Sequence, residues 1–152
     1  MQIAPITGNI GAAISGLNLK QPISSDLWAA LRDALNRYFV LVLRDQHLDV
    51  SEHQRLSEVF GKPMINPYAP GPDANPEMTY VIKEAGERSG VFGGGWHTDL
   101  SFLDQPPSGS VLCALEVPPH GGDTLFSSQQ AAWDSLAQPL CNLLENRNAI
   151  HV

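Results

Sequence analysis

The chain reads Gly94-Gly95-Trp96-His97-Thr98-Asp99-Leu100-Ser101-Phe102 a little beyond its midpoint, and this stretch decides how the fold is interpreted. On a β-strand alternate side chains point to the same face, so His97 and Asp99 can converge on one point while Thr98 faces away. An imidazole and a carboxylate are two of the three ligands of the 2-His-1-carboxylate facial triad, which binds Fe(II) and leaves coordination positions open for oxygen chemistry. The stretch therefore predicts a metal site built on His97 and Asp99.

A second tripeptide of this kind, His47-Leu48-Asp49, shows that the spacing alone is a weak signal. At this content of histidine and aspartate, an accidental His-x-Asp is expected in roughly 30% of chains. Here the pair follows an apolar run and precedes a helix that we expect to begin at Ser51, with Ser51 and Gln54 as its capping box. We interpret His47 and Asp49 as turn residues.

Composition indicates a globular protein of one domain. The chain has 152 residues, of which 43% are hydrophobic and 16% charged, and this is typical of a folded protein with a substantial core. A formal net charge of −7 argues against nucleic acid as a partner, because that role needs a basic face. We expect no membrane partner either, since no apolar run approaches the ~18 residues of a membrane span. We interpret the two cysteines, Cys113 and Cys141, as reduced thiols in a cytoplasmic protein.

Residues 1–61 are expected to form an α/β flank. The segment from Ile3 to Ile14 is short, apolar and interrupted by glycine, which favours an opening hairpin. Apolar residues at helical spacing follow a predicted cap at Ser25. The continuous apolar run Phe39–Leu43 then predicts a buried strand.

Residues 62–95 are rich in proline and glycine and contain one strand-like run, Met78–Ile82. A long irregular segment in a compact domain is more often functional than idle. We therefore predict a lid or substrate-loop region that borders the metal. A disordered surface loop is the alternative.

The remaining residues, 96–152, contain one further apolar run and two helical segments. Ser110–Val117 is interpreted as a core strand. His120 falls in a glycine-containing turn and is expected to be exposed to solvent. Ser127 and Gln130 are predicted to form a capping box for a helix that continues to Leu136 and forms again after Pro139.

Four blocks of sequence resemble the taurine and 2,4-dichlorophenoxyacetate dioxygenase family of Fe(II)/2-oxoglutarate enzymes in order and spacing. They are Arg44-Asp45-Gln46, Phe60-Gly61, Trp96 to Phe102 with Pro106-Pro107 after it, and Gly121-Gly122-Asp123-Thr124-Leu125-Phe126. The resemblance implies a mainly β fold with flanking helices (α+β), namely a double-stranded β-helix, or jelly roll, of the clavaminate synthase-like type. Residues 96–152 would form the first part of the catalytic barrel.

The resemblance also implies roles for individual residues. His97 and Asp99 would bind Fe(II), and Thr124 would contact the distal carboxylate of the cosubstrate 2-oxoglutarate. Asn66, Tyr68 and Leu100 would line the substrate pocket. The chain departs from the taurine enzymes at three positions, because Asn66 replaces a His, Ala69 a Tyr and Gly93 an Asn. These departures count against taurine as the substrate.

The family's distal iron-binding His and its 2-oxoglutarate-binding Arg have no counterpart here, so we expect a C-terminally truncated chain that holds the N-terminal half of the enzyme. His151 and His120 are the histidines after Asp99, and neither matches the distal ligand. The function implied is hydroxylation of a small, anionic organic substrate, with O2 consumed and succinate and CO2 released. We expect little turnover by the 152-residue chain alone, and a homo-oligomer is left open. The alternatives are a non-catalytic β-barrel binding module and a cupin-type metal-dependent hydrolase or isomerase.

Overall fold

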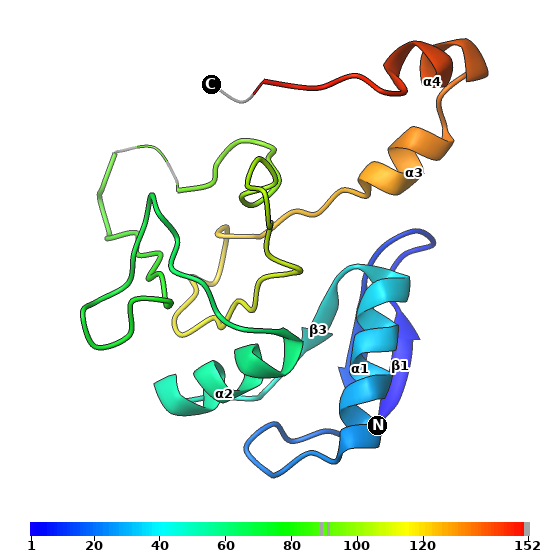
Figure 1. The fold of residues 1–152 in the computed structure, drawn as a ribbon. Helices are drawn as coiled ribbons and strands as arrows, with labels where there is room; N and C mark the ends of the chain where they lie inside the picture. The colour runs from blue at the N-terminus through cyan, green and yellow to red at the C-terminus, as the bar shows by residue number, and fades with distance from the viewer. Residues whose placement is uncertain (89, 91, 151–152) are drawn as a thin grey trace. The chain divides into compact units, whose positions relative to one another are not determined.

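The structure, a computed structural model, describes residues 1–88, 90 and 92–150. In these residues three strands and four helices follow in the order β1, β2, α1, β3, α2, α3 and α4 (Figure 1). The chain divides into two compact units, one formed by Met1–Leu48 with Cys113–Val152 and the other by Asp49–Leu112. Each unit is described by itself below.

The first unit contains a small mixed sheet with the order β1-β2-β3. Strand β1 (Gln2–Pro5) pairs antiparallel with β2 (Ala12–Ser15), which confirms the hairpin predicted from the sequence. Strand β3 (Leu41–Leu43) pairs parallel with β2, from Ala12 opposite Leu41 to Ile14 opposite Leu43. A parallel pair needs a crossover connection, and helix α1 provides it.

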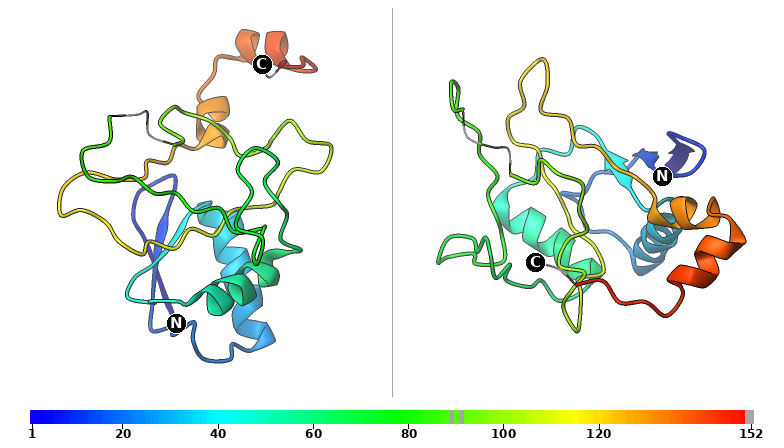
Figure 2. Two further views of the ribbon diagram at one scale, coloured as in Figure 1. Left: turned by 90° about the vertical axis from the view of Figure 1, so that its left-hand side faces the viewer. Right: turned by 90° about the horizontal axis from the view of Figure 1, so that it is seen from above.

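Helix α1 (Ser25–Tyr38) lies beside the sheet (Figures 1 and 2) and supplies part of its core. The described residues with buried hydrophobic side chains are Ala12, Ile14, Leu19, Leu31, Ala34 and Leu48, all of them in the first unit. The cap predicted at Ser25 is wrong by one residue, because the Ser24 side chain accepts the Leu27 N–H at 3.3 Å. The helix ends at Phe39, whose φ of 62° stops it, so β3 begins two residues later than predicted.

Helix α2 (Val50–Phe60) opens the second unit. Its capping box is formed by Asp49 and Glu52, not by Ser51 and Gln54 as predicted. The Asp49 carboxylate accepts the Glu52 N–H at 2.8 Å, and the Glu52 carboxylate accepts the Asp49 N–H at 2.9 Å. An aspartate and a glutamate three residues apart satisfy two N–H groups at the helix start, and the helix therefore begins one residue earlier than predicted.

Helices α3 (Gln129–Asp134) and α4 (Gln138–Leu144) belong to the first unit. The cap of α3 is Ser128 rather than the predicted Ser127, because the Ser128 hydroxyl accepts the Ala131 N–H at 3.1 Å. Pro139 lies in the first turn of α4 instead of preceding the helix. Proline is tolerated there because the N–H groups of a first turn have no partner within the helix.

The segment between α2 and α3 is drawn as loop in all three ribbon views (Figures 1 and 2). The runs Met78–Ile82 and Ser110–Val117 were both predicted as strands, and neither forms one in the structure. A strand requires a partner with which its backbone groups can pair, and the described part of this segment provides no such ladder. The side chains of both runs are largely exposed.

Candidate metal centre

The structure brings the side chains of His97 and Asp99 together. His97 Nε2 lies 3.1 Å from Asp99 Oδ1. The convergence expected from their spacing is present, but it does not arise on a strand, because a turn begins at Asp99 and Leu100 adopts a φ of 49°. A tight turn brings the side chains of two residues separated by one position to the same point, as a pleated strand would.

Gly93 allows the imidazole to occupy this place. Its φ is 68°, a value that side chains disfavour, and a Cβ on Gly93 would lie 3.3 Å from Cε1 of His97. A side chain at this position would therefore require the imidazole to shift by a few tenths of an ångström.

The imidazole of His97 has a defined orientation. Its Nδ1 lies 2.8 Å from the carbonyl oxygen of Gly95. Because a carbonyl only accepts hydrogen bonds, Nδ1 carries the proton in the neutral ring, and Nε2 presents its lone pair to Asp99. Two electron-rich atoms 3.1 Å apart require a cation between them, either a proton or a metal ion.

The hydrogen bond to Gly95 raises the pKa of His97, and the carboxylate of Asp99 raises the same pKa further. Burial acts in the opposite direction and is outweighed. In the absence of metal the pair therefore favours a proton on Nε2, and this is the position that a metal ion would take from it.

The second carboxylate oxygen of Asp99 also has a partner. The hydroxyl of Ser110 donates to Asp99 Oδ2 at 2.9 Å. The next residue, Val111, accepts a hydrogen bond through its carbonyl from His53 Nε2 on α2, at 2.9 Å. Sequence analysis identified neither Ser110 nor His53 as a site residue.

The donor set fits a divalent metal. Metal–ligand bonds of about 2.1 Å at right angles place two donor atoms about 3 Å apart, close to the 3.1 Å between Nε2 and Oδ1. Their side chains are 54% and 57% exposed, so an ion can reach both. No group of three or more potential ligands occurs within the described residues.

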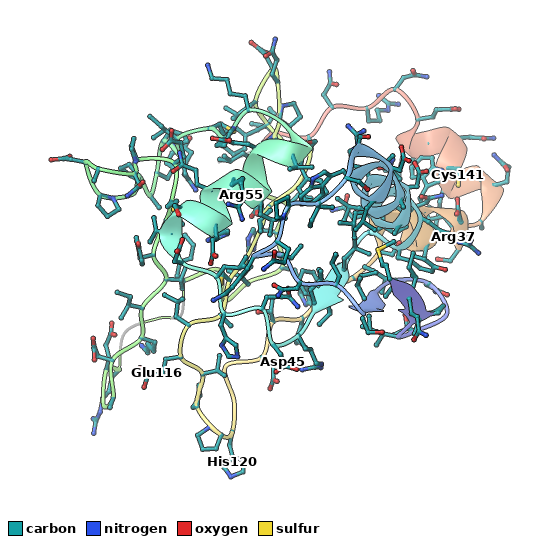
Figure 3. The ribbon with its side chains drawn as sticks, turned by 90° about the horizontal axis from the view of Figure 1, so that it is seen from below. Arg37, Asp45, Arg55, Glu116, His120 and Cys141 are labelled. Atoms are coloured by element: carbon teal, nitrogen blue, oxygen red, sulfur yellow. The ribbon has the colours of Figure 1, made fainter. Side chains whose placement is uncertain are left out.

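The other histidines considered as ligands lie elsewhere. The Asp49 carboxylate caps α2 and also accepts the Ser51 hydroxyl at 2.8 Å, so it is engaged as a cap. His47 is exposed and adopts a φ of 43°. His120 stands at the outer end of its loop (Figure 3), exposed as predicted. The prediction about His151 falls outside the described residues.

Tyr68, one of the three predicted substrate residues, contacts the turn that carries Asp99. Its ring packs edge-on against Phe102 with centroids 6.0 Å apart. Asn66 holds the loop in shape by accepting the N–H groups of Tyr68 and Ala69 at 2.9 and 3.3 Å. Leu100 is half-buried in the turn itself. The structure thus places part of the predicted lid against the turn of the His97–Asp99 pair.

Thr124, the predicted 2-oxoglutarate contact, is exposed and belongs to the first compact unit. The His97–Asp99 pair belongs to the second unit. The role of Thr124 therefore stays a prediction.

A hollow of about 460 Å³ lies at the ends of β2 and β3, where Lys20, Arg44 and His47 are among its lining residues. None of the predicted site residues lines it. The side chain of Gln46 accepts the Leu19 N–H at 2.9 Å and donates to the Leu17 carbonyl at 3.2 Å. We interpret this hollow as a junction between loops that is held together by the side chain of Gln46.

A His-x-Asp pair in a turn, with each ligand supported by a neighbour, defines a candidate mononuclear metal protein. The model of the "Taurine catabolism dioxygenase TauD, TfdA family" matches residues 2–152. The chain belongs to this family, and the resemblance seen in its four sequence blocks is confirmed.

Relatives and solved structures agree with the assignment. An alkylsulfatase of Acinetobacter baylyi is 35% identical over 152 residues, which cover 99% of this chain and 47% of the relative. An alpha-ketoglutarate-dependent sulfate ester dioxygenase of Pseudomonas putida is 30% identical, with 99% and 49% covered. The crystal structure of a taurine dioxygenase from Burkholderia xenovorans is similar with a TM-score of 0.81 at 30% identity, covering 95% of this chain and 51% of that one. The chain thus spans about half the length of the relatives that it matches.

Proposed function

We propose that this chain carries the metal-binding turn of an Fe(II)- and 2-oxoglutarate-dependent dioxygenase. The observation that supports this most directly is the 3.1 Å approach of His97 Nε2 and Asp99 Oδ1. The Gly95 carbonyl and the Ser110 hydroxyl hold the other donor atom of each side chain. Iron and 2-oxoglutarate, when bound, supply the oxidation of a substrate C–H bond by O2, with release of succinate and CO2. The role of the protein is to orient the ligands and the substrate and to keep water away from them.

We extend the proposal to the architecture. The fold is a double-stranded β-helix with outer helices, and residues 96–152 contribute to its barrel. Residues 62–95 form a lid over the metal, a role supported by the contact of Tyr68 with Phe102. Thr124 binds the distal carboxylate of 2-oxoglutarate. Similarity to family members of known structure supports this arrangement.

The substrate that we propose is a small organic anion, with sulfate esters first and sulfonates second. An alkylsulfatase and a sulfate ester dioxygenase are among the similar relatives, and a sulfonate dioxygenase of Saccharomyces cerevisiae is 34% identical. Taurine itself is disfavoured because Asn66 and Gly93 replace a charge-capable imidazole and an amide that would grip a sulfonate. Asn66, Tyr68 and Leu100 line the pocket in this proposal.

We place the protein in the cytoplasm, where reducing conditions keep thiols free. Cys113 and Cys141 are both free and half-buried, which agrees with that compartment. Within the described residues, no helix has the length and apolar character needed to cross a membrane. A small-molecule substrate is the proposed partner, and a second copy of the chain is considered in the Discussion.

The test of the metal assignment compares two aspartates in a chain extended to the length of the relatives. Asp99→Ala should abolish Fe(II)-dependent succinate release, because it removes a ligand. Asp49→Ala should retain it and lose only a helix cap, about 1 kcal/mol of stability. Equal loss of iron binding in both variants would contradict the choice of site.

The same assay tests the substrate and separates the alternatives. With an alkyl sulfate, succinate should form together with inorganic sulfate, and taurine should give less succinate. A cupin-type hydrolase would release product without consuming 2-oxoglutarate, and a binding module would release nothing. Succinate formation at the full rate by the 152-residue chain alone would make His151 a candidate third ligand, and His151→Ala would then decide the question.

A further inference from the structure

We propose that Ser110 is a positioning residue of this metal centre. Its hydroxyl holds one oxygen of the Asp99 carboxylate and so keeps the other oxygen directed at His97. This inference rests on the proposed function, since it concerns the same metal site. Ser110 has no part in the motifs from which the site was predicted.

The two oxygens of Asp99 have separate partners in the structure. Oδ2 accepts the Ser110 hydroxyl at 2.9 Å, and Oδ1 faces His97 Nε2 at 3.1 Å. The torsion that rotates a carboxylate has a broad energy minimum, and the Asp99 side chain is 57% exposed. Packing alone therefore does not fix the carboxylate plane, and a directional hydrogen bond to one oxygen does.

Ser110 lies in a segment that is hydrogen-bonded to helix α2. His53 on α2 donates through Nε2 to the Val111 carbonyl at 2.9 Å, directly after Ser110. Two residues before it, the Ser108 hydroxyl donates to the Phe60 carbonyl at the end of α2, at 3.4 Å. The chain thus contacts α2 both before and after Ser110. All these residues lie in the second compact unit. A donor fixed to a helix can hold a carboxylate in place.

His97 and Asp99 each have one hydrogen bond that fixes the orientation of the side chain. The Gly95 carbonyl fixes the imidazole at 2.8 Å, and the Ser110 hydroxyl fixes the carboxylate at 2.9 Å. Outer groups of this kind orient metal ligands, and their loss typically lowers metal affinity by about 10–100-fold. A carbonyl cannot be removed by substitution of its own residue, but a serine hydroxyl can, which makes Ser110 the accessible test.

The experiment titrates Mn(II) into the chain extended to the length of the relatives and follows the paramagnetic broadening of the His97 ring signals by NMR. The signals of His47 and His120 report non-specific binding in the same sample. Ser110→Ala should raise the Mn(II) concentration for half-broadening about 10-fold or more. Ser110→Thr keeps a hydroxyl and should stay near the original value. Ser108→Ala removes one of the two contacts of this segment with α2 and should raise the half-broadening concentration by clearly less than Ser110→Ala, because that hydroxyl contacts a backbone carbonyl and not Asp99.

Results other than the expected ones would contradict different parts of the proposal. If Asp99→Ala abolishes the broadening but Ser110→Ala leaves it unchanged, the positioning role is wrong and the metal site stands. If Ser108→Ala weakens binding as much as Ser110→Ala, the segment acts only as a structural support and the inference is overturned. If the original chain shows no preferential broadening of His97, the proposed metal centre is wrong and this inference with it.

Discussion

At the scale of single residues, the candidate metal centre is a pair of side chains that share one cation, for which a proton and a metal ion compete. The Gly95 carbonyl holds the proton on Nδ1 of His97, and Asp99 attracts a positive charge to Nε2. Both interactions favour the imidazolium form and raise the pKa of His97 above its usual value. The metal ion must displace that proton, so metal affinity falls as the pH drops through this pKa and recovers as the pH rises above it.

We therefore expect His97 to titrate above its ordinary pKa in the metal-free chain. An NMR pH titration of the ring signals measures this directly. Asp99→Asn should shift the pKa of His97 downward, because it removes the negative charge, while the Gly95 bond continues to raise it. A pKa at or below the ordinary value in the unsubstituted chain would contradict the geometry. His120, which is exposed on its loop, provides the internal comparison.

A second prediction concerns the close approach of Gly93 to the imidazole of His97. Gly93→Ala places a Cβ 3.3 Å from Cε1 of His97 on a backbone with a φ of 68°. We expect a loss of about 1–2 kcal/mol in local stability, the usual cost of a left-handed residue with a side chain, together with weaker Mn(II) binding at His97. Gly86→Ala is the matched control, because Gly86 has a φ of 81° and a Cβ there meets nothing within 4 Å. Equal effects of the two substitutions would show that the approach of Gly93 to the imidazole is unimportant.

At the scale of elements, helix α2 is the support on which the site depends. Its start is fixed by Asp49 and Glu52, and its residues His53 and Phe60 contact the segment that carries Ser110. The cap can be tested separately from the metal. Asp49→Ala should lower the free energy of unfolding by about 1 kcal/mol in urea denaturation, and Ser51→Ala by clearly less. A larger effect at Ser51 would restore the capping box predicted from the sequence.

Helix positions could be predicted from the sequence to within a residue or two, but their caps could not. Periodicity locates a helix, whereas the cap depends on which of several polar side chains reaches a free N–H. Ser24 and Ser128 were each confused with an adjacent serine, because neighbouring serines have the same propensity to cap. The convergence of His97 and Asp99 was predicted from their spacing on a strand, but the structure produces it at a turn. The contacts of Ser110 and His53 were beyond prediction, since they join residues 11 and 58 positions apart.

At the scale of the whole molecule, the core is concentrated in one of the two units. The buried hydrophobic residues described by the structure all lie before Asp49, on β2, α1 and the loops beside them. The unit Asp49–Leu112 contains none of them, although it carries the candidate metal centre. A unit with few buried apolar contacts opens at low free energy. The candidate metal centre therefore lies in the unit with few buried apolar contacts, where a bound ion would add stability.

The long loop segment between α2 and α3 exposes several apolar side chains. Leu112, Leu115, Val117 and Leu125 are each exposed by 64% to 75%, as are other apolar residues of the long loop segment. Exposed apolar surface of this kind favours association. We expect the 152-residue chain to form oligomers or aggregates at micromolar concentration, measured by sedimentation velocity. Leu115→Glu should reduce self-association, whereas Glu116→Gln, a change at the adjacent position that exposes no new apolar surface, should not. A monomer that melts cooperatively and stays monomeric at high concentration would mean that these side chains are covered in solution, and the arrangement of the loop segment would then differ from the one described.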